Sequence, residues 1–260
     1  MPVRRIVLFL ISNISIFTQL YAQTTFPISE FFTSGISVKA GVGYHTVKDE
    51  FISKEKYSGF SPMFLLDWSK YHETYGFDLY MEILSSAKIK NYSMPAKLTE
   101  FSLGINYLYS IGSSELLGKK IYLFLGPTPE VFFFFRDQNL AQGGETVFDA
   151  YSVTGMFSAG INFSALLPIN NQWQLEGHMQ SNVIAFGGKL KDFKNSSNSF
   201  VKFLTPFNEQ RFIFDISANY KLTRSIQIKT GYRFNMTRIT AWDYLISTGD
   251  NLTASVSFTL

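Results

Sequence analysis

The side chains that could do chemistry in this sequence are charged residues that alternate with apolar ones along the chain. Opposed charges that face an enclosed, low-dielectric space must pair or lose their charge. We therefore expect one network of ion pairs and hydrogen bonds inside a closed structure. Its expected members are Asp78, Glu82, Glu100, Glu176, His178, Arg211, Asp215, Lys229 and Arg233, with Asp67, Glu130, Lys39, Lys88 and Arg136 placed in the same way.

Two interpretations of this charge network stay open. The network fills the interior as packing, or it lines a narrow polar path for small solutes or ions. Asp215 and Lys229 lie on one face of consecutive predicted strands joined by a short turn. Residues on one face of adjacent strands interact, so we expect these two to be near neighbours.

His178 is the candidate for catalysis, because it is the only histidine in the middle of an alternating segment. A histidine can act as general base for a serine hydroxyl when a carboxylate or amide orients the ring. Glu176 and Gln180 share the face of His178, and Ser181 follows three residues later. A spacing of three places His178 and Ser181 on opposite faces of a regular strand, and only a bulge could bring them together. The alternative is a histidine that belongs to the polar network.

Other residue types restrict the chemistry further. The chain has no cysteine, which excludes thiol nucleophiles, disulfides and cysteine-ligated metals. Three scattered histidines do not make a metal site, so we expect no metal and no cofactor. His45 is expected near the outer rim with Asp49 and Glu50, but no second acid pair completes a peptide-cleaving site there.

The elements that must position these residues are strands, because polar and apolar residues alternate with a period of two. Most of the alternating segments are near ten residues or longer, which matches the 9–11 residues of a tilted membrane-spanning strand. Long and short connections also alternate, as in outer-membrane barrels. The ten segments are 36–44, 60–68, 77–83, 101–109, 121–135, 153–163, 173–179, 212–220, 226–234 and 252–260, the long connections are 46–57, 91–97, 137–149, 187–208 and 237–249, and the short ones are 69–74, 112–119, 168–171 and 222–224.

The alternation does not by itself say which face is inside. A backbone in hydrocarbon must satisfy every polar group internally, so strands cross a membrane only as a closed barrel. The apolar face would then contact lipid and the polar face would line the interior, whereas a soluble barrel has the faces inverted. The composition, 46% hydrophobic and 17% charged, favours the membrane arrangement.

Two local features interrupt the pattern. Pro62 has no N–H for a strand ladder, which indicates a bulge or a weakened pairing. Residues 132–135 are four consecutive phenylalanines. Either Phe132 and Phe134 pack inside as a plug, or the run forms an apolar patch for a lipid or a partner.

The chain divides into three expected regions. Residues 1–22 are typical of a cleaved signal peptide, with Arg4 and Arg5 before a short apolar stretch. Residues 23–34 form a periplasmic segment and residues 35–260 form the barrel. Removal of residues 1–22 leaves 21 basic and 20 acidic residues, a net charge of +1. This balance gives no electrostatic support for nucleic-acid binding.

The alternating strands and the closing segment Leu252–Leu260 resemble those of small Gram-negative outer-membrane β-barrel proteins, the class of OmpA-like and OmpW-like barrels. The resemblance covers residues 35–260. It implies a single all-β, antiparallel, up-and-down transmembrane barrel of about ten strands, with eight or twelve as alternatives. The usual terminal aromatic is replaced by Leu260, with Phe258 two positions earlier.

The resemblance implies a location in the outer membrane and says little about activity. Expected partners are outer-membrane lipids and lipopolysaccharide, the barrel-assembly machinery and an envelope protein. Lysines and phenylalanines in segment 187–208, beginning with Lys189, either contact lipopolysaccharide or belong to a solvated loop. The function most consistent with the sequence is a structural or binding role in the cell envelope. The alternatives are a narrow channel or small-solute transporter, and a lipid or peptide hydrolase.

Overall fold

The computed structural model of the chain describes residues 34–50, 53–90, 95–142, 145–193 and 196–260. The expected signal peptide, 1–22, and residues 23–33 of the expected periplasmic segment lie outside the described residues. No helix in the described part of the chain is long and apolar enough to cross a membrane. The strands are β1 (Ser34–Asp49), β2 (Ser53–Tyr71), β3 (Tyr75–Lys90), β4 (Pro95–Leu116), β5 (Lys119–Gln142), β6 (Glu145–Pro168), β7 (Trp173–Phe193), β8 (Ser196–Leu204), β9 (Glu209–Lys221), β10 (Ile226–Ile239) and β11 (Leu245–Thr259).

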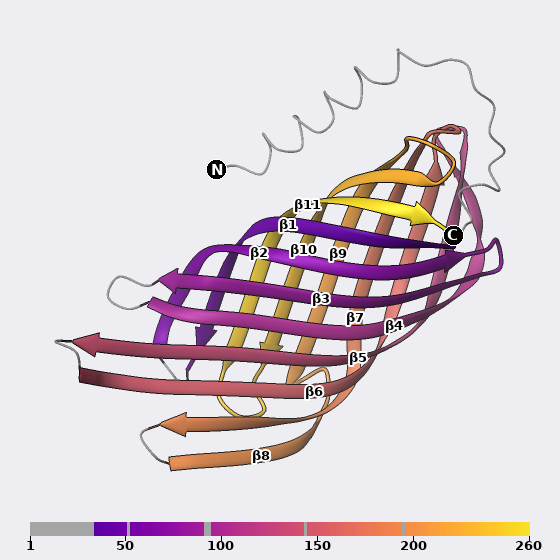
Figure 1. Ribbon diagram of the computed structural model, residues 1–260. Coiled ribbons are helices and arrows are strands. Elements are labelled where there is room, and N and C mark those ends of the chain that lie inside the picture. The colour runs from indigo at the N-terminus through magenta and orange to yellow at the C-terminus, as the bar shows by residue number, and fades with distance from the viewer. Residues whose placement is uncertain (1–33, 51–52, 91–94, 143–144, 194–195) are drawn as a thin grey trace.

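Ten of these strands close into a ring (Figure 1). The order around the ring is β1-β2-β3-β4-β5-β6-β7-β9-β10-β11, and β11 pairs with β1 to close it. All neighbouring strands are antiparallel, including β6 with β7, where the two ends of the sheet meet. The described residues therefore form an all-β, antiparallel barrel, and the predicted fold class and strand number are confirmed.

β8 is an additional strand beside the ring. Residues 173–181 of β7 pair with β9, whereas residues 185–193 of the same strand pair with β8. A turn over residues 205–208 connects β8 to β9, with the N–H of Asn208 donating to the carbonyl of Thr205 at 3.0 Å. β8 and β9 thus follow one another along one edge of β7, like a single strand interrupted by a turn.

The connections at the barrel end away from the C-terminus are shorter than predicted. Segments 46–57, 91–97, 137–149, 187–208 and 237–249 are largely or partly strand, so their prediction as long loops was wrong. The alternation weakens in these segments, but backbone hydrogen bonds between strands form whatever the side-chain pattern. The short turns at the other end are confirmed, and one is the two-residue turn Leu117-Gly118, with φ of 52° and 72°.

The strands are longer than a membrane requires. β5 and β6 have 24 residues each, which at about 3.3 Å per residue gives a length of about 80 Å. Even with a tilt of about 45°, such strands span about 55 Å, against an apolar band of about 25 Å in outer-membrane barrels. The barrel wall formed by β5 and β6 therefore extends well beyond the thickness of a bilayer.

The two faces of the sheet differ as predicted for a barrel in lipid. Large apolar side chains such as Val38, Phe60 and Leu252 are exposed outside, whereas Ser61 and Asn251 are buried inside. The alternative of a soluble barrel, with its apolar face inside, does not describe this part of the wall. β2 also shows the expected irregularity near Pro62, because its register with β3 shifts between Ser58 and Met63.

Three groups of side chains fill the interior. An outer plug of buried apolar residues occupies the end away from the termini, and a smaller apolar cluster of Leu108, Tyr122, Phe124 and Leu166 lies near the turns at the other end. Charged and polar side chains lie between them. The outer plug contains Val47, Tyr57, Leu84, Ile89, Ala96, Leu98, Phe132, Phe134, Met156, Ala185, Leu204, Ile239 and Leu245.

Candidate functional site in the barrel interior

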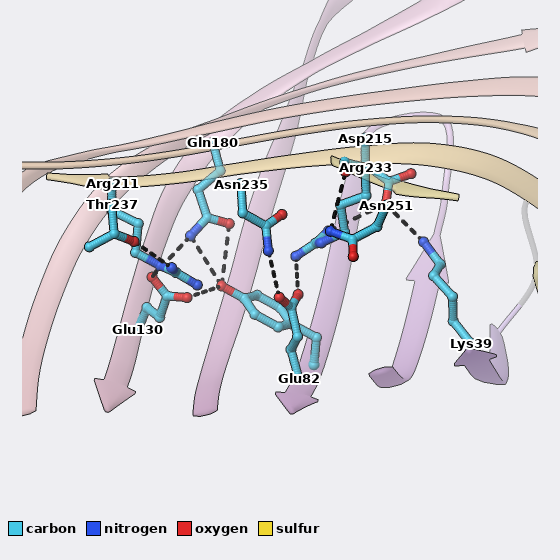
Figure 2. Close-up of polar contacts among 11 residues, drawn as sticks. Lys39, Glu82, Glu130, Gln180, Arg211, Asp215, Arg233, Asn235, Thr237 and Asn251 are labelled. Carbon is cyan, nitrogen blue, oxygen red and sulfur yellow. Dashed lines mark hydrogen bonds and ion pairs between the residues drawn. The ribbon is translucent and has the colours of Figure 1, made fainter. Parts of the chain in front are cut away.

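The first group of charged contacts runs across the interior from β1 to β3. Lys39 Nζ lies 2.9 Å from Asp215 Oδ2, and Arg233 Nη1 donates to the same oxygen at 3.3 Å. Arg233 also pairs with Glu82, and Asn235 Nδ2 donates to Glu82 Oε1 at 3.0 Å. Figure 2 shows this chain of alternating charges, in which residues from β1, β3, β9 and β10 meet.

The second group lies beside the first, below the outer plug. Arg211 Nε donates to Glu130 Oε2 at 2.9 Å and Nη1 donates to Thr237 Oγ1 at 3.1 Å. The Tyr80 hydroxyl donates to Glu130 Oε1 at 3.1 Å and accepts a hydrogen bond from Gln180 Nε2. Arg211 and Glu130 are each 1% exposed, so this pair is fully enclosed (Figure 2).

The Arg211 guanidinium connects the polar residues to the outer plug, because its Cζ lies 4.1 Å from the centroid of the Phe132 ring. Phe132 and Phe134 are both fully buried inside the barrel. Of the two interpretations of the four consecutive phenylalanines, the structure therefore has the interior packing. Phe135 points outward and is exposed.

The third group lies toward the short turns, at the barrel end that holds the C-terminus. Lys229 Nζ lies 3.2 Å from Glu176 Oε2, and the Tyr71 hydroxyl donates to Asp78 Oδ2 at 2.7 Å. His178 Nδ1 lies 2.8 Å from Ser164 Oγ, and His178 Nε2 lies 3.9 Å from Glu176 Oε2. The candidates Glu176, His178 and Lys229 thus come together.

One expected pair does not form. The register of β9 and β10 sets Asp215 opposite Arg233, and Lys229 opposite Asn219. Asp215 therefore contacts Arg233 and Lys39, whereas Lys229 contacts Glu176 on β7. The sequence predicted the face of each residue, but Lys229 lies four residues along β10 from the position opposite Asp215, and this register could not be read from the alternation.

The remaining candidates lie apart from these groups. Glu100 is buried nearer the plug, where the Ser247 hydroxyl donates to its Oε1 at 2.6 Å. Arg136 is buried beside the Tyr57 ring, 4.4 Å from its centroid. The side chain of Lys88 lies outside the described residues.

Sequence analysis missed an interior ion pair at the outer end. Lys189 Nζ lies 3.0 Å from Asp49 Oδ1, and the Ser152 hydroxyl donates to Asp49 Oδ2 at 2.8 Å. Both residues were expected in outer loops, but both are buried inside the barrel. The signal was present in the spacing, because Asp49 continues the inward positions Val47 and His45 of β1.

The histidines do not form a hydrolytic site in the described residues. Ser181 is exposed on the outer face while His178 points inside, as the spacing predicted. Ser164 does contact His178, but its hydroxyl donates to Asn162 Oδ1 at 2.9 Å and its side chain is fully buried. His45 lies inside the barrel, 3.0 Å from Asn251 Oδ1, so its expected position at the rim was wrong.

A cavity of about 90 Å³ lies among the third group of charges. A recess of about 40 Å³ adjoins it at the rim formed by the start of β1 and the end of β11. Glu176, Lys229 and Tyr71 line both spaces. This end of the interior is therefore accessible, in contrast with the end filled by the outer plug.

The closed antiparallel ring, with apolar residues outside and polar residues inside, is the fold of Gram-negative outer-membrane β-barrels. Among solved structures, the chain is similar to the outer-membrane protease OmpT from Escherichia coli, with 8% sequence identity, a TM-score of 0.52, and coverage of 88% of this chain and 96% of that chain. It is also similar to the translocator domain of the autotransporter NalP from Neisseria meningitidis, with 9% identity, a TM-score of 0.47, and coverage of 87% and 88%. No protein-family model and no curated protein matches the sequence. At 8% identity the likeness to OmpT shows a shared fold and carries no activity over to this chain.

Proposed function

We propose that the protein is an integral outer-membrane protein of a Gram-negative bacterium, with a closed barrel and a structural or binding role in the cell envelope. In this proposal residues 1–22 direct secretion, and the barrel-assembly machinery inserts the chain. The outward apolar side chains contact membrane lipids. The binding role is carried by the outer end of the barrel, through lipopolysaccharide or an envelope protein partner.

The observation that supports a barrel closed to solutes is that two successive layers of side chains fill its interior. The first contains the enclosed pair Arg211 and Glu130 with Tyr80 and Gln180. The second is the outer plug, in which Phe132, Phe134 and eleven other buried residues meet. The apolar residues of this layer oppose the passage of ions, because an ion loses its hydration there without a replacement.

The two alternative functions have less support. A channel needs a continuous water-filled path through the barrel. The accessible cavity is at the proposed periplasmic end, and the Arg211–Glu130 layer and the outer plug both lie between it and the outer end. A hydrolase needs a serine hydroxyl that donates to a base and meets substrate. Ser164 contacts His178 and Asn162, but it is fully buried and is not among the residues that line the cavity.

The outer end offers a surface for the proposed binding role. Val201 and Phe203 on β8 are more than 60% exposed, and Phe207 in the following turn is 94% exposed. Lys202 is also exposed beside them. Lys189 does not contribute to this surface, because its ammonium group is buried with Asp49. An apolar patch with a lysine is suited to acyl chains and phosphates of a lipid.

The test is single-channel conductance of the refolded protein in planar bilayers, with folding checked separately by a heat-dependent gel shift. We expect a folded but silent barrel. A control variant, Glu82→Gln, keeps the size of a side chain in the charge network and should be silent as well. Stable, ion-selective steps that change in Glu82→Gln would establish a path through the interior and overturn the proposal.

A further inference from the structure

The cavity in the third group of charges has more negative than positive side chains in its wall. The carboxylates Asp67, Asp78, Glu176 and Asp215 line it, with the cations Lys39, Lys229 and Arg233. Arg233 is shared with Glu82, which lies outside the wall. His178 also lines the cavity, and with this ring neutral the wall has one carboxylate more than it has cations.

The pairing of these charges shows where the excess lies. Lys39 contacts Asp215, and Lys229 contacts Glu176. Asp67 and Asp78 have no ion pair among the described residues, and Asp78 accepts a hydrogen bond from the Tyr71 hydroxyl. Enclosed carboxylates cost free energy unless a cation or hydrogen-bond donors compensate them.

A second observation points to a ligand that donates hydrogen bonds. Asn106 Oδ1 and Asp215 Oδ1 are buried in the cavity wall without a hydrogen-bond partner among the described residues, and Gln174 Oε1 is in the same state at the adjoining recess. The three residues are 2–6% exposed. All three atoms are acceptors, so a donor would satisfy each of them; of the other unpartnered buried atoms at the two spaces, the Ser37 and Ser257 hydroxyls can donate or accept, and Arg233 Nε is a donor.

The arrangement of the oxygens favours an organic cation over a metal ion. Among the described residues, no group of three or more histidines and carboxylates is arranged to hold a metal. A volume of about 90 Å³ has room for several water molecules or for one compact organic group.

We propose that this cavity binds a compact organic cation with several N–H donors, such as a protonated primary amine. The ammonium group lies against Asp67 and Asp78, and its N–H groups donate to the acceptors in the wall. Entry is through the recess at the rim. The assignment of that rim to the periplasm rests on the proposed function. The binding site itself is argued independently of it.

The test is a calorimetric titration of the folded, full-length chain with methylammonium chloride at constant ionic strength. We expect saturable binding. Tetramethylammonium, which has no N–H donor, and sodium, which has a charge but no donor, should each bind at least tenfold more weakly. The proposal would be overturned if methylammonium showed no saturable binding, or if the three cations bound equally. Neither result requires a variant.

Variants then locate the site. Asp67→Asn and Asp78→Asn should each weaken methylammonium binding tenfold or more. The matched control is Glu100→Gln, which neutralises a buried interior carboxylate that does not line the cavity and keeps an acceptor for the Ser247 hydroxyl. Its affinity should stay within twofold of the unmodified chain. An equal loss in Glu100→Gln would assign the binding to the general interior charge and contradict the proposed site.

Discussion

The inner and outer sections of the barrel have opposite side-chain arrangements, and β4 changes from one to the other within a single strand. In the section nearer the termini, Leu103 and Ile105 are exposed outside, whereas Ser102 and Asn106 are buried inside. In the outer section, Ala96 and Leu98 are buried inside, and Lys97 is exposed. The strand keeps its period of two from Pro95 to Tyr109, so only the polarity of the faces is exchanged over these residues.

Along β4, the height on the barrel axis therefore determines which face is apolar. Where the wall is in lipid, the outward face is apolar and the interior can hold charges that pair with one another. Where β4 projects beyond the bilayer, Pro95 and Lys97 are exposed outward, and the inward Ala96 and Leu98 belong to the apolar outer plug, as in a soluble barrel. The two arrangements that sequence analysis set against each other therefore both occur, at different heights.

The largest loss of stability is expected from removing an ion-pair partner in the charged section. Arg211→Leu leaves Glu130 enclosed without its ion-pair partner, which should lower the free energy of unfolding by about 3–5 kcal/mol. The measurement is urea unfolding of the refolded protein in lipid bilayers. The double variant Arg211→Leu with Glu130→Leu should recover most of the loss. If the double variant were as unstable as the single one, the two side chains would not act as a pair.

The next effect tests the apolar section. Leu98→Ala opens a gap in the outer plug and should lower the free energy of unfolding by about 3 kcal/mol. Thr99→Ala, the neighbouring change on the outward face, should alter it by no more than about 0.5 kcal/mol. The same unfolding measurement compares them. Similar values for the two variants would mean that the outer section has no packed interior.

The smallest loss of stability is expected from removing one hydroxyl at the boundary between the two sections. Tyr80→Phe removes the hydroxyl that joins Glu130 to Gln180 and should cost about 1–2 kcal/mol. Tyr109→Phe removes a hydroxyl from an exposed side chain on the outer face and is the matched control. A cost below that of the control would show that Tyr80 does not contribute to the enclosed network.

Much of the inner section could be predicted from the sequence, because lipid contact imposes a strict alternation there. The ring of ten strands, the turn positions and the inward direction of Glu82, Asp215 and Arg233 all follow from that pattern. The partners of each charge could not be predicted in the same way. They depend on strand register, which placed Asp215 with Arg233 and Lys39.

The outer section was less predictable for a different physical reason. The inward residues of its strands mix apolar plug residues with buried charges such as Asp49 and Lys189, so the alternation of polar and apolar residues is weaker there. Asp49 and Lys189 were therefore expected in solvent, although they pair inside the barrel. The buried Phe132 and Phe134 were the one visible sign of an apolar interior, because a run of aromatics has two faces and one must point inward.

The exchange of faces along β4 is tested most directly by placing an arginine at two outward positions of that strand. Leu103→Arg puts the charge where we expect lipid and should cost about 2–4 kcal/mol of unfolding free energy in bilayers. Thr99→Arg puts it where we expect water and should cost about 0–1 kcal/mol. Equal costs at Leu103 and Thr99 would contradict the account, because both positions would then lie in the same medium.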